Sequence, residues 1–173
     1  MNRKWIHIIA TIIVVLSLAG CGKTVEERIE VGVASAQTTF NESPEEPNTT
    51  IGHIQLFAPK GYTVEQGVDE MNFVLTKDKE SYILFVNTIE TEDSQLNYEN
   101  LLADNMKDVV KSQKFETDGM FGFSAVVKHD DEDQYELIVS IGGIKLTTMS
   151  NGKKIEDKLT EMMQVVRSVQ ITE

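Results

Sequence analysis

The chain contains a single cysteine, Cys21, among its 173 residues. One thiol cannot close an intramolecular disulfide, so a domain built from this chain must be stabilised by its apolar core. The residues that follow position 20 number 153, and a single domain of that size can bury a sufficient core without a crosslink. The sequence therefore predicts one ordinary globular domain.

The N-terminus has the pattern of an export signal. Met1-Asn2-Arg3-Lys4 forms a short basic head, and the segment from Trp5 to Leu18 is almost entirely apolar. A transmembrane helix needs about 20 apolar residues to cross a hydrocarbon core about 30 Å thick, which is more than this run provides. We therefore expect residues 1–20 to be a signal peptide.

The residues at the end of this apolar run indicate a site of lipid attachment at the cysteine. Leu18-Ala19-Gly20-Cys21 resembles the lipobox of bacterial lipoproteins. The resemblance implies that a diacylglyceryl group is joined to the Cys21 sulfur and that a signal peptidase cuts directly before this residue. Two acyl chains, such as palmitate, at roughly 0.8 kcal/mol per buried CH₂, hold a protein on a membrane much more tightly than one chain. The expected location is the extracytoplasmic face of the cell membrane. The alternative is an unmodified thiol near an ordinary cleavage site.

The charge of the exported chain argues against nucleic acid as a partner. Without Arg3 and Lys4, 14 cationic residues remain against 28 acidic ones, which gives a formal charge of −14. Binding to phosphate backbones depends on Lys and Arg, so an anionic surface of this kind is repelled by nucleic acid and by anionic lipid. Attachment to a membrane would therefore have to be covalent.

The composition of residues 21–50 predicts a lipidated, acidic and flexible tether. Its second half is rich in Glu, Ser and Thr and contains two of the three prolines of the chain. Such a segment buries too little apolar surface to offset the entropy of ordering it. Whether Val25 to Ala36 forms a short helix or strand is left open by the pattern.

Residues 51–173 are expected to form the folded domain, in which strands alternate with two helices. The first helix is predicted over residues 97–113 and the second over residues 153–169, each with apolar residues at three- and four-residue steps. This order predicts an α+β fold, with helices packed on an antiparallel sheet. The expected strands cover residues 51–58, 72–76, 82–87, 115–116, 124–128, 135–141 and 144–149, and a short final strand could follow over residues 170–172.

One further set of residues resembles a known family. The start of the domain carries Ile54, Leu56, Pro59, Gly61 and Tyr62, and the second helix ends in the sequence VVRSVQI. Together with the element order, these residues look like the PsbP/DcrB-like fold, which includes photosynthetic accessory subunits and bacterial surface lipoproteins. The resemblance implies an α/β/α sandwich and a binding or accessory role. It implies no catalytic residues.

Two segments of the chain weakly resemble catalytic or metal-binding patterns. Ser124 lies in Gly122-Phe123-Ser124-Ala125-Val126, which lacks the last glycine of a nucleophile elbow. The run from His129 to Asp133 places several oxygen ligands together, which could attract Ca²⁺, but it lacks the glycine and the distant Glu of a calcium loop. A solvated hairpin tip is the favoured interpretation of this run.

We therefore expect a membrane-anchored extracytoplasmic lipoprotein that is not an enzyme and uses no cofactor and no metal. Its domain would act as a binding or accessory module for an envelope partner or a small ligand. The alternative hypothesis is a metal-dependent hydrolase that uses the His129–Asp133 cluster.

Overall fold

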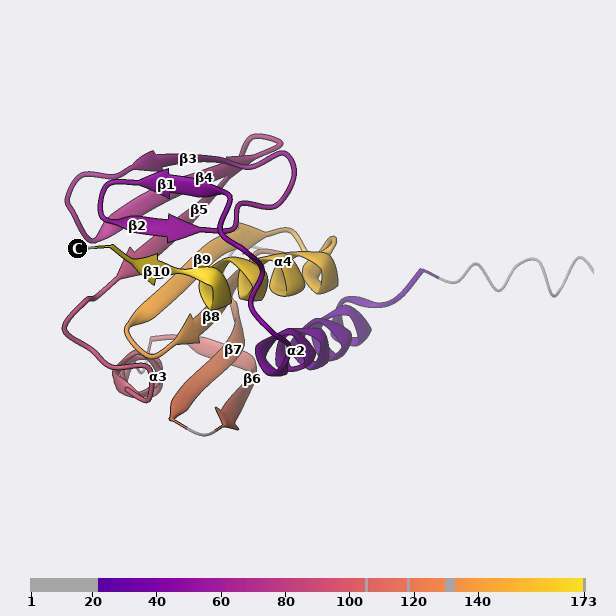
Figure 1. Cartoon of the computed structure of the whole chain (residues 1–173). Helices are drawn as coiled ribbons and strands as arrows, with labels where there is room; N and C mark the ends of the chain where they lie inside the picture. Colours follow the sequence, from indigo (N-terminus) through magenta and orange to yellow (C-terminus); the bar gives the residue numbers. More distant parts are fainter. Residues whose placement is uncertain (1–21, 105, 118, 130–132, 173) are drawn as a thin grey trace, which may run out of the picture.

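A computed structural model describes residues 22–104, 106–117, 119–129 and 133–172. Its centre is a seven-stranded antiparallel sheet with the strand order β3-β4-β5-β9-β8-β7-β6 (Figure 1). The strands are β3 (Thr63–Gln66), β4 (Asn72–Lys77), β5 (Glu80–Val86), β6 (Asp108–Thr117), β7 (Met120–Lys128), β8 (Tyr135–Ile141) and β9 (Ile144–Ser150).

Alternating side chains give this sheet one strongly apolar face, which we call the inner face. One row of paired residues crosses it through Phe73, Leu84, Leu146, Val139 and Ser124, and all five are fully buried. Because successive residues of a strand point to opposite sides, such a row fixes the pairing register across the sheet. The strands predicted over residues 72–76, 82–87, 135–141 and 144–149 are confirmed, with ends that differ by at most two residues.

Two tight turns connect the central strands. Asp78 and Lys79 join β4 to β5 with φ values of 51° and 70°, which is the backbone of a type I′ hairpin turn. Gly142 and Gly143 join β8 to β9 directly beneath the connection from β5 to the next helix. A Cβ atom on Gly142 would overlap the Thr91 carbonyl oxygen, so this turn requires glycine for space as well as for its φ of 49°.

Two parallel helices, α2 (Val25–Asn41) and α4 (Ile155–Ser168), cover the inner face. Near their first turns Arg28 contacts Glu156 at 2.8 Å, and near their last turns Arg167 Nε donates to the Phe40 carbonyl oxygen at 3.2 Å. The helices approach closely at Gly32, where an added Cβ would lie 2.9 Å from a Leu159 methyl and 3.2 Å from Glu156 Cα.

The flexible tether predicted over residues 21–50 is wrong for residues 25–41. Thr24 caps α2 in a capping box with Glu27, and the buried face of the helix includes Ile29, Val33 and Phe40. Phe40 lies over Gly122 of β7, with its ring centroid 5.5 Å from that of Phe115. The domain therefore begins near residue 24 rather than at residue 51, because this helix supplies part of the core.

The opposite, outer face of the sheet carries a shorter helix, α3 (Leu96–Ala103). Together with Leu101 of this helix, Phe121, Phe123 and Val127 of β7 form a second apolar cluster. The helix predicted over residues 97–113 is correct for its first half and wrong for its second, because residues from 108 onward pair with β7 as strand β6. Since α3 packs mainly on β7 and β8, Ile83 of β5 remains 43% exposed on this face.

A small three-stranded sheet completes the fold. It has the order β1-β2-β10, built from β1 (Thr49–Ile51), β2 (Ile54–Leu56) and β10 (Gln170–Ile171). The single strand predicted over residues 51–58 is thus divided by a turn at Gly52, whose φ is 55°. The buried Ile54 and Leu56 join the main core. The predicted α+β class is confirmed, with helices on both faces of the antiparallel sheet.

Candidate functional site

The predicted anchor residues, Leu18, Ala19, Gly20 and Cys21, lie outside the described residues. The described chain starts with Gly22, Lys23 and Thr24 and enters α2 at Val25, so its beginning lies at the N-terminal end of α2 (Figure 1). From residue 22 onward, the described part of the chain includes no helix that is both long and apolar enough to cross a membrane.

The two weak catalytic patterns of the sequence do not assemble into a described site. Ser124 is fully buried in the middle of β7, and its hydroxyl has no hydrogen-bond partner among the residues that the structure describes. Of the His129–Asp133 cluster, Asp130, Asp131 and Glu132 lie outside the described residues, while His129 and Asp133 are exposed. The described side chains include no group of three or more His, Cys, Asp or Glu that could hold a metal ion.

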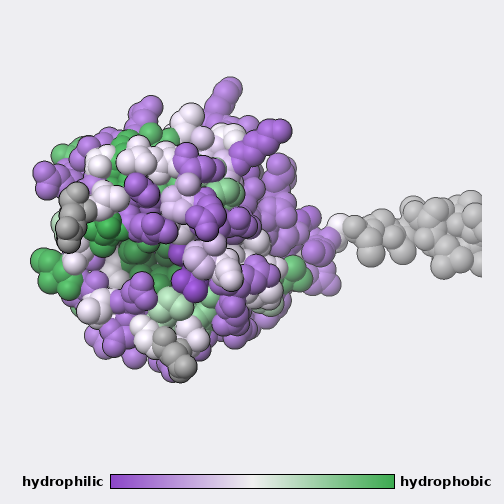
Figure 2. Space-filling model, in the orientation of Figure 1, coloured by the Kyte–Doolittle hydropathy of each residue, from purple (hydrophilic) through white to green (hydrophobic). Residues whose placement is uncertain are grey.

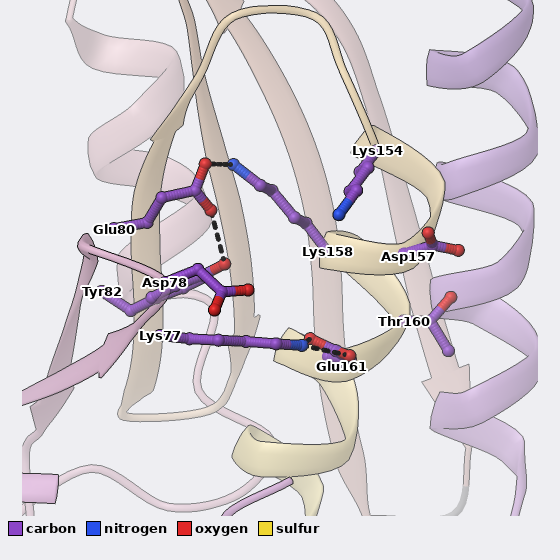
Figure 3. Close-up of a pocket in the computed structure, with 9 residues that line it drawn as sticks. All are labelled: Lys77, Asp78, Glu80, Tyr82, Lys154, Asp157, Lys158, Thr160 and Glu161. Atoms are coloured by element: carbon purple, nitrogen blue, oxygen red, sulfur yellow. Dashed lines mark hydrogen bonds and ion pairs between the residues drawn. The ribbon is translucent and has the colours of Figure 1, made fainter. Parts of the chain in front are cut away.

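One cavity of about 280 Å³ lies between the β4–β5 turn and the first half of α4 (Figure 3). The turn contributes Lys77 and Glu80, and the helix contributes Lys158 and Glu161. Lys77 contacts Glu161 at 2.7 Å and Lys158 contacts Glu80 at 2.9 Å, so each ammonium group is paired with a carboxylate from the other element.

Two tyrosine hydroxyls donate hydrogen bonds to the carboxylates of these ion pairs. The Tyr62 hydroxyl donates to Glu161 Oε2 at 2.9 Å, and the Tyr82 hydroxyl donates to Glu80 Oε2 at 3.4 Å. Burial, the neighbouring Tyr82 and the Glu161 carboxylate raise the pKa of Tyr62 far above its usual range. Burial and the nearby carboxylates of Glu80 and Glu161 raise the pKa of Tyr82 to about 12.

These groups join the β4–β5 turn to α4, and few of their charges or hydroxyls remain available to bind or react with a ligand. Both tyrosines stay protonated at neutral pH, so neither can act as a general base there. The charges of Lys77, Lys158, Glu80 and Glu161 are already satisfied within the protein. We therefore interpret this cavity as the edge of a structural ion-pair network.

A second group of cavities surrounds α3 and the connection that leads into it. Three cavities of about 240, 220 and 230 Å³ adjoin there. The first and second share Asn87, Glu90 and Gly143, while the second and third share Asn97, Asn100 and Lys145. We call these three cavities together the α3 groove.

The first cavity has more apolar lining residues than the other two, and we call it the apolar end of the α3 groove. It lies where the last turn of α4 and β10 meet the β8–β9 turn, and Figure 2 shows hydrophobic side chains gathered in a hollow on this face of the molecule. Charged and polar side chains stand at its rim, among them Glu92 and Arg167. Its apolar lining comes from Met120, Ile141, Ile144, Val166, Val169 and Ile171.

The other two cavities form a polar end, between α3 and the outer face of β5, β8 and β9. Lys145 projects from β9, and its ammonium nitrogen lies 5.7 Å from the centre of the Phe85 ring. Burial, together with the nearby charge of Lys107, lowers the pKa of Lys145 below its usual value. Asn97 is held in place because its amide donates to Ser140 Oγ at 3.1 Å and to the Gly142 carbonyl at 3.0 Å.

Sequence reasoning missed the α3 groove. Lys145 lies on the polar side of an alternating strand, which is the ordinary position of an exposed lysine. Its partial burial depends on α3 and on the β5–α3 connection, which the turn at Gly142 and Gly143 fixes through the hydrogen bond from the Asn87 N–H to the Gly143 carbonyl at 3.1 Å.

Comparison with known proteins gives no match to a family model and no curated relative. Among solved structures, the chain is similar to cyanobacterial PsbP (CyanoP) from Synechocystis sp. PCC 6803, with 10% identity and a TM-score of 0.41 over 69% of this chain and 86% of that one. A second similar structure is a protein from Bacteroides thetaiotaomicron VPI-5482, with 11% identity and a TM-score of 0.35 over 70% of this chain and 46% of that one. A PsbP protein is thus among the structural neighbours, but TM-scores below 0.5 do not establish family membership.

Proposed function

We propose that this protein is a lipoprotein, anchored through Cys21 on the extracytoplasmic face of the cell membrane, whose domain is a non-enzymatic binding module. The observation that carries the proposal is the position of the α3 groove relative to the start of the domain. The chain enters at the N-terminal end of α2, whereas the apolar end of the groove lies beside the last turn of the parallel helix α4.

This arrangement suits a module held at a membrane surface. The 17 residues of α2 span about 25 Å, so the apolar end of the groove lies roughly one helix length from the attachment point. Only Gly22, Lys23 and Thr24 separate Cys21 from this helix. Such a short link keeps the domain beside the bilayer and leaves the far end of α4 accessible to a ligand or an envelope partner.

The lining of the groove also favours binding over catalysis. It combines apolar side chains with polar and charged ones, so a small ligand could be held both by contact with apolar side chains and by hydrogen bonds. Two carboxylates at its polar end are engaged in structural contacts: Glu136 contacts Lys107 at 2.6 Å, and Asp104 accepts from the Met106 N–H at 3.1 Å.

The anchor is tested by metabolic labelling with a fatty-acid probe in intact bacteria. Cys21→Ser should abolish the label and release the protein from pelleted membranes, because it removes the sulfur that carries the lipid. Ser17→Ala is the matched control, since it changes a neighbouring residue and leaves Leu18–Cys21 intact. Retention of both label and pelleting by Cys21→Ser would contradict the proposal.

A further inference from the structure

We propose that the polar end of the α3 groove binds the carboxylate group of a small ligand, with Lys145 as its cationic partner. This inference rests on the proposed binding function and specifies the chemical class of the ligand. The observation behind it is that Lys145 is partly buried and does not form an ion pair with another described residue.

Lys145 differs from every other lysine in the described part of the chain. Lys23, Lys77, Lys107, Lys111 and Lys158 each contact a carboxylate within 4.0 Å. The lysines outside these ion pairs, namely Lys60, Lys79, Lys114, Lys128, Lys153 and Lys154, are exposed to solvent. Lys145 alone is both partly buried and absent from the ion pairs formed between described residues.

Acidic side chains line the two cavities beside Lys145, yet each of them has another partner. Glu136 is bound by Lys107 at 2.6 Å, Asp104 accepts from the Met106 N–H, and Glu90 accepts from the Ser94 hydroxyl. The Lys145 ammonium has lost part of its hydration, and the nearby Glu136 carboxylate forms its ion pair with Lys107 instead. A ligand carboxylate would supply that missing charge, and a charge-assisted hydrogen bond of this kind is stronger in a partly dehydrated site than in water.

Further polar groups stand beside Lys145 and can complete the site. The side chains of Asn100 and Thr147 line the same cavity, and neither takes part in a side-chain hydrogen bond between described residues. An amide and a hydroxyl can each donate to a carboxylate oxygen. Apolar side chains also line these cavities, Leu101, Phe123 and Ile138 in one and Phe85 and Leu96 in the other, beside the charged groups of Asp104, Lys107 and Glu136.

The size of the site limits the ligand. Cavities of about 230 and 220 Å³ on the two sides of Lys145 accommodate a small acid with a compact apolar body. Phenylacetate is a suitable probe, with phenylacetamide as a neutral analogue of the same shape and phenethylamine as a cationic one. For a probe of about ten non-hydrogen atoms we expect a Kd on the order of 1 mM or tighter.

The experiment is a titration of the isotope-labelled domain, residues 22–173, followed by amide chemical shifts. Phenylacetate should produce saturable shifts at Asn100, Lys145 and Thr147. Lys145→Gln should weaken its binding at least tenfold, and Lys145→Arg should stay within about threefold of the unchanged protein because it keeps the charge. Lys154→Gln is the matched control, since it removes an exposed lysine outside the groove. Thermal unfolding of each variant verifies that the fold is kept.

Two results would overturn the inference, and they separate it from the proposed function. If phenylacetamide or phenethylamine binds at these residues as tightly as phenylacetate, or if Lys145→Gln has no effect, the groove is a binding site but not one for carboxylates. If none of the three probes shifts the residues of the groove, both the carboxylate site and the assignment of binding to this groove fail.

Discussion

Ser124 lies on the inner face of the sheet, in the row that also contains Phe73, Leu84, Leu146 and Val139. Its neighbours on the adjacent strands are Val139 and Gln113, and its hydroxyl has no hydrogen-bond partner among the described residues. A buried hydroxyl without a partner loses its hydration and gains nothing in return. Ser124, which the sequence pattern indicated as a possible nucleophile, therefore lowers the stability of the core.

Ser124→Ala should consequently leave the protein as stable or raise its free energy of unfolding by up to about 1 kcal/mol. Ser140→Ala is the matched control on the neighbouring strand, where the hydroxyl donates to the Ile144 carbonyl at 2.7 Å and accepts from Asn97 at 3.1 Å. That variant should lose about 1–2 kcal/mol. Urea unfolding of both variants measures the difference, and a clear loss of stability in Ser124→Ala would show that its hydroxyl is satisfied.

Glu156 gives a pH dependence to the contact between α2 and α4. Burial raises its pKa, but its own backbone N–H, the Arg28 guanidinium and the Lys23 ammonium lower it more, so the net pKa lies below the ordinary value of 4.5. A carboxyl with a lowered pKa in the folded state stabilises the fold above its unfolded pKa. This contribution is lost as the pH falls through the folded pKa.

Glu156→Gln should therefore destabilise the protein at pH 7, by up to about 1 kcal/mol for a partly exposed ion pair, and the difference should shrink below pH 4.5. Denaturant unfolding at neutral and acidic pH measures it. Glu46→Gln serves as control because Glu46 is exposed and belongs to none of the ion pairs between described residues. A difference that grows as the pH is lowered would contradict the assigned direction of the shift.

At the scale of the elements, α2 shows what the sequence could predict and what it could not. Ile29, Val33, Ala36 and Phe40 follow helical spacing, so the apolar face of the helix was present in the pattern. The polar and acidic residues of this segment nevertheless favoured a flexible tether, because composition alone does not reveal whether a core needs an additional helix. The need arises from β7, where Gly122 leaves room for the Phe40 ring.

The boundary between α3 and β6 shows the opposite case. Leu101, Leu102, Met106, Val109 and Val110 keep helical spacing well beyond the observed end of α3 at Ala103. Val109 pairs instead with Val127 of β7 and Val110 lies at a bulge, both within the edge strand β6, where β-branched side chains pack well. Pairing with β7 therefore determines the secondary structure of a segment whose local apolar spacing predicts a helix.

The corrected boundary predicts that residues 51–173 alone do not form the stable domain. Removing residues 22–50 uncovers the inner face of β6 and β7, so this shortened chain should unfold at much lower denaturant concentration than residues 22–173, or not fold at all. Phe40→Ala in the full domain should lose about 3–5 kcal/mol, the usual cost of a deleted core phenylalanine. Val31→Ala, on the exposed side of the same helix, should cost much less. Equal stability of the two chain lengths would show that α2 is dispensable.

At the scale of the whole molecule, the short link to the proposed anchor sets the orientation of the domain on the membrane. Three residues, Gly22 to Thr24, span at most about 10 Å, so the N-terminal ends of α2 and α4 should remain near the bilayer. The 14 residues of α4 then carry its far end about 21 Å away. A flexible tether of about 29 residues would instead allow the domain to turn freely.

Two exposed positions at the ends of α4 distinguish these arrangements. Lys154→Cys and Gln170→Cys each add one reactive thiol, since the Cys21 sulfur is occupied by lipid in the proposed protein. A fluorophore on Lys154→Cys should be quenched more strongly by quencher-bearing lipids than the same fluorophore on Gln170→Cys. In a second sample, a flexible linker of about 25 residues inserted after Gly22 should reduce the difference, because it restores free rotation. Equal quenching at the two positions without the inserted linker would mean that the short connection does not orient the domain and that the α3 groove is not held away from the membrane.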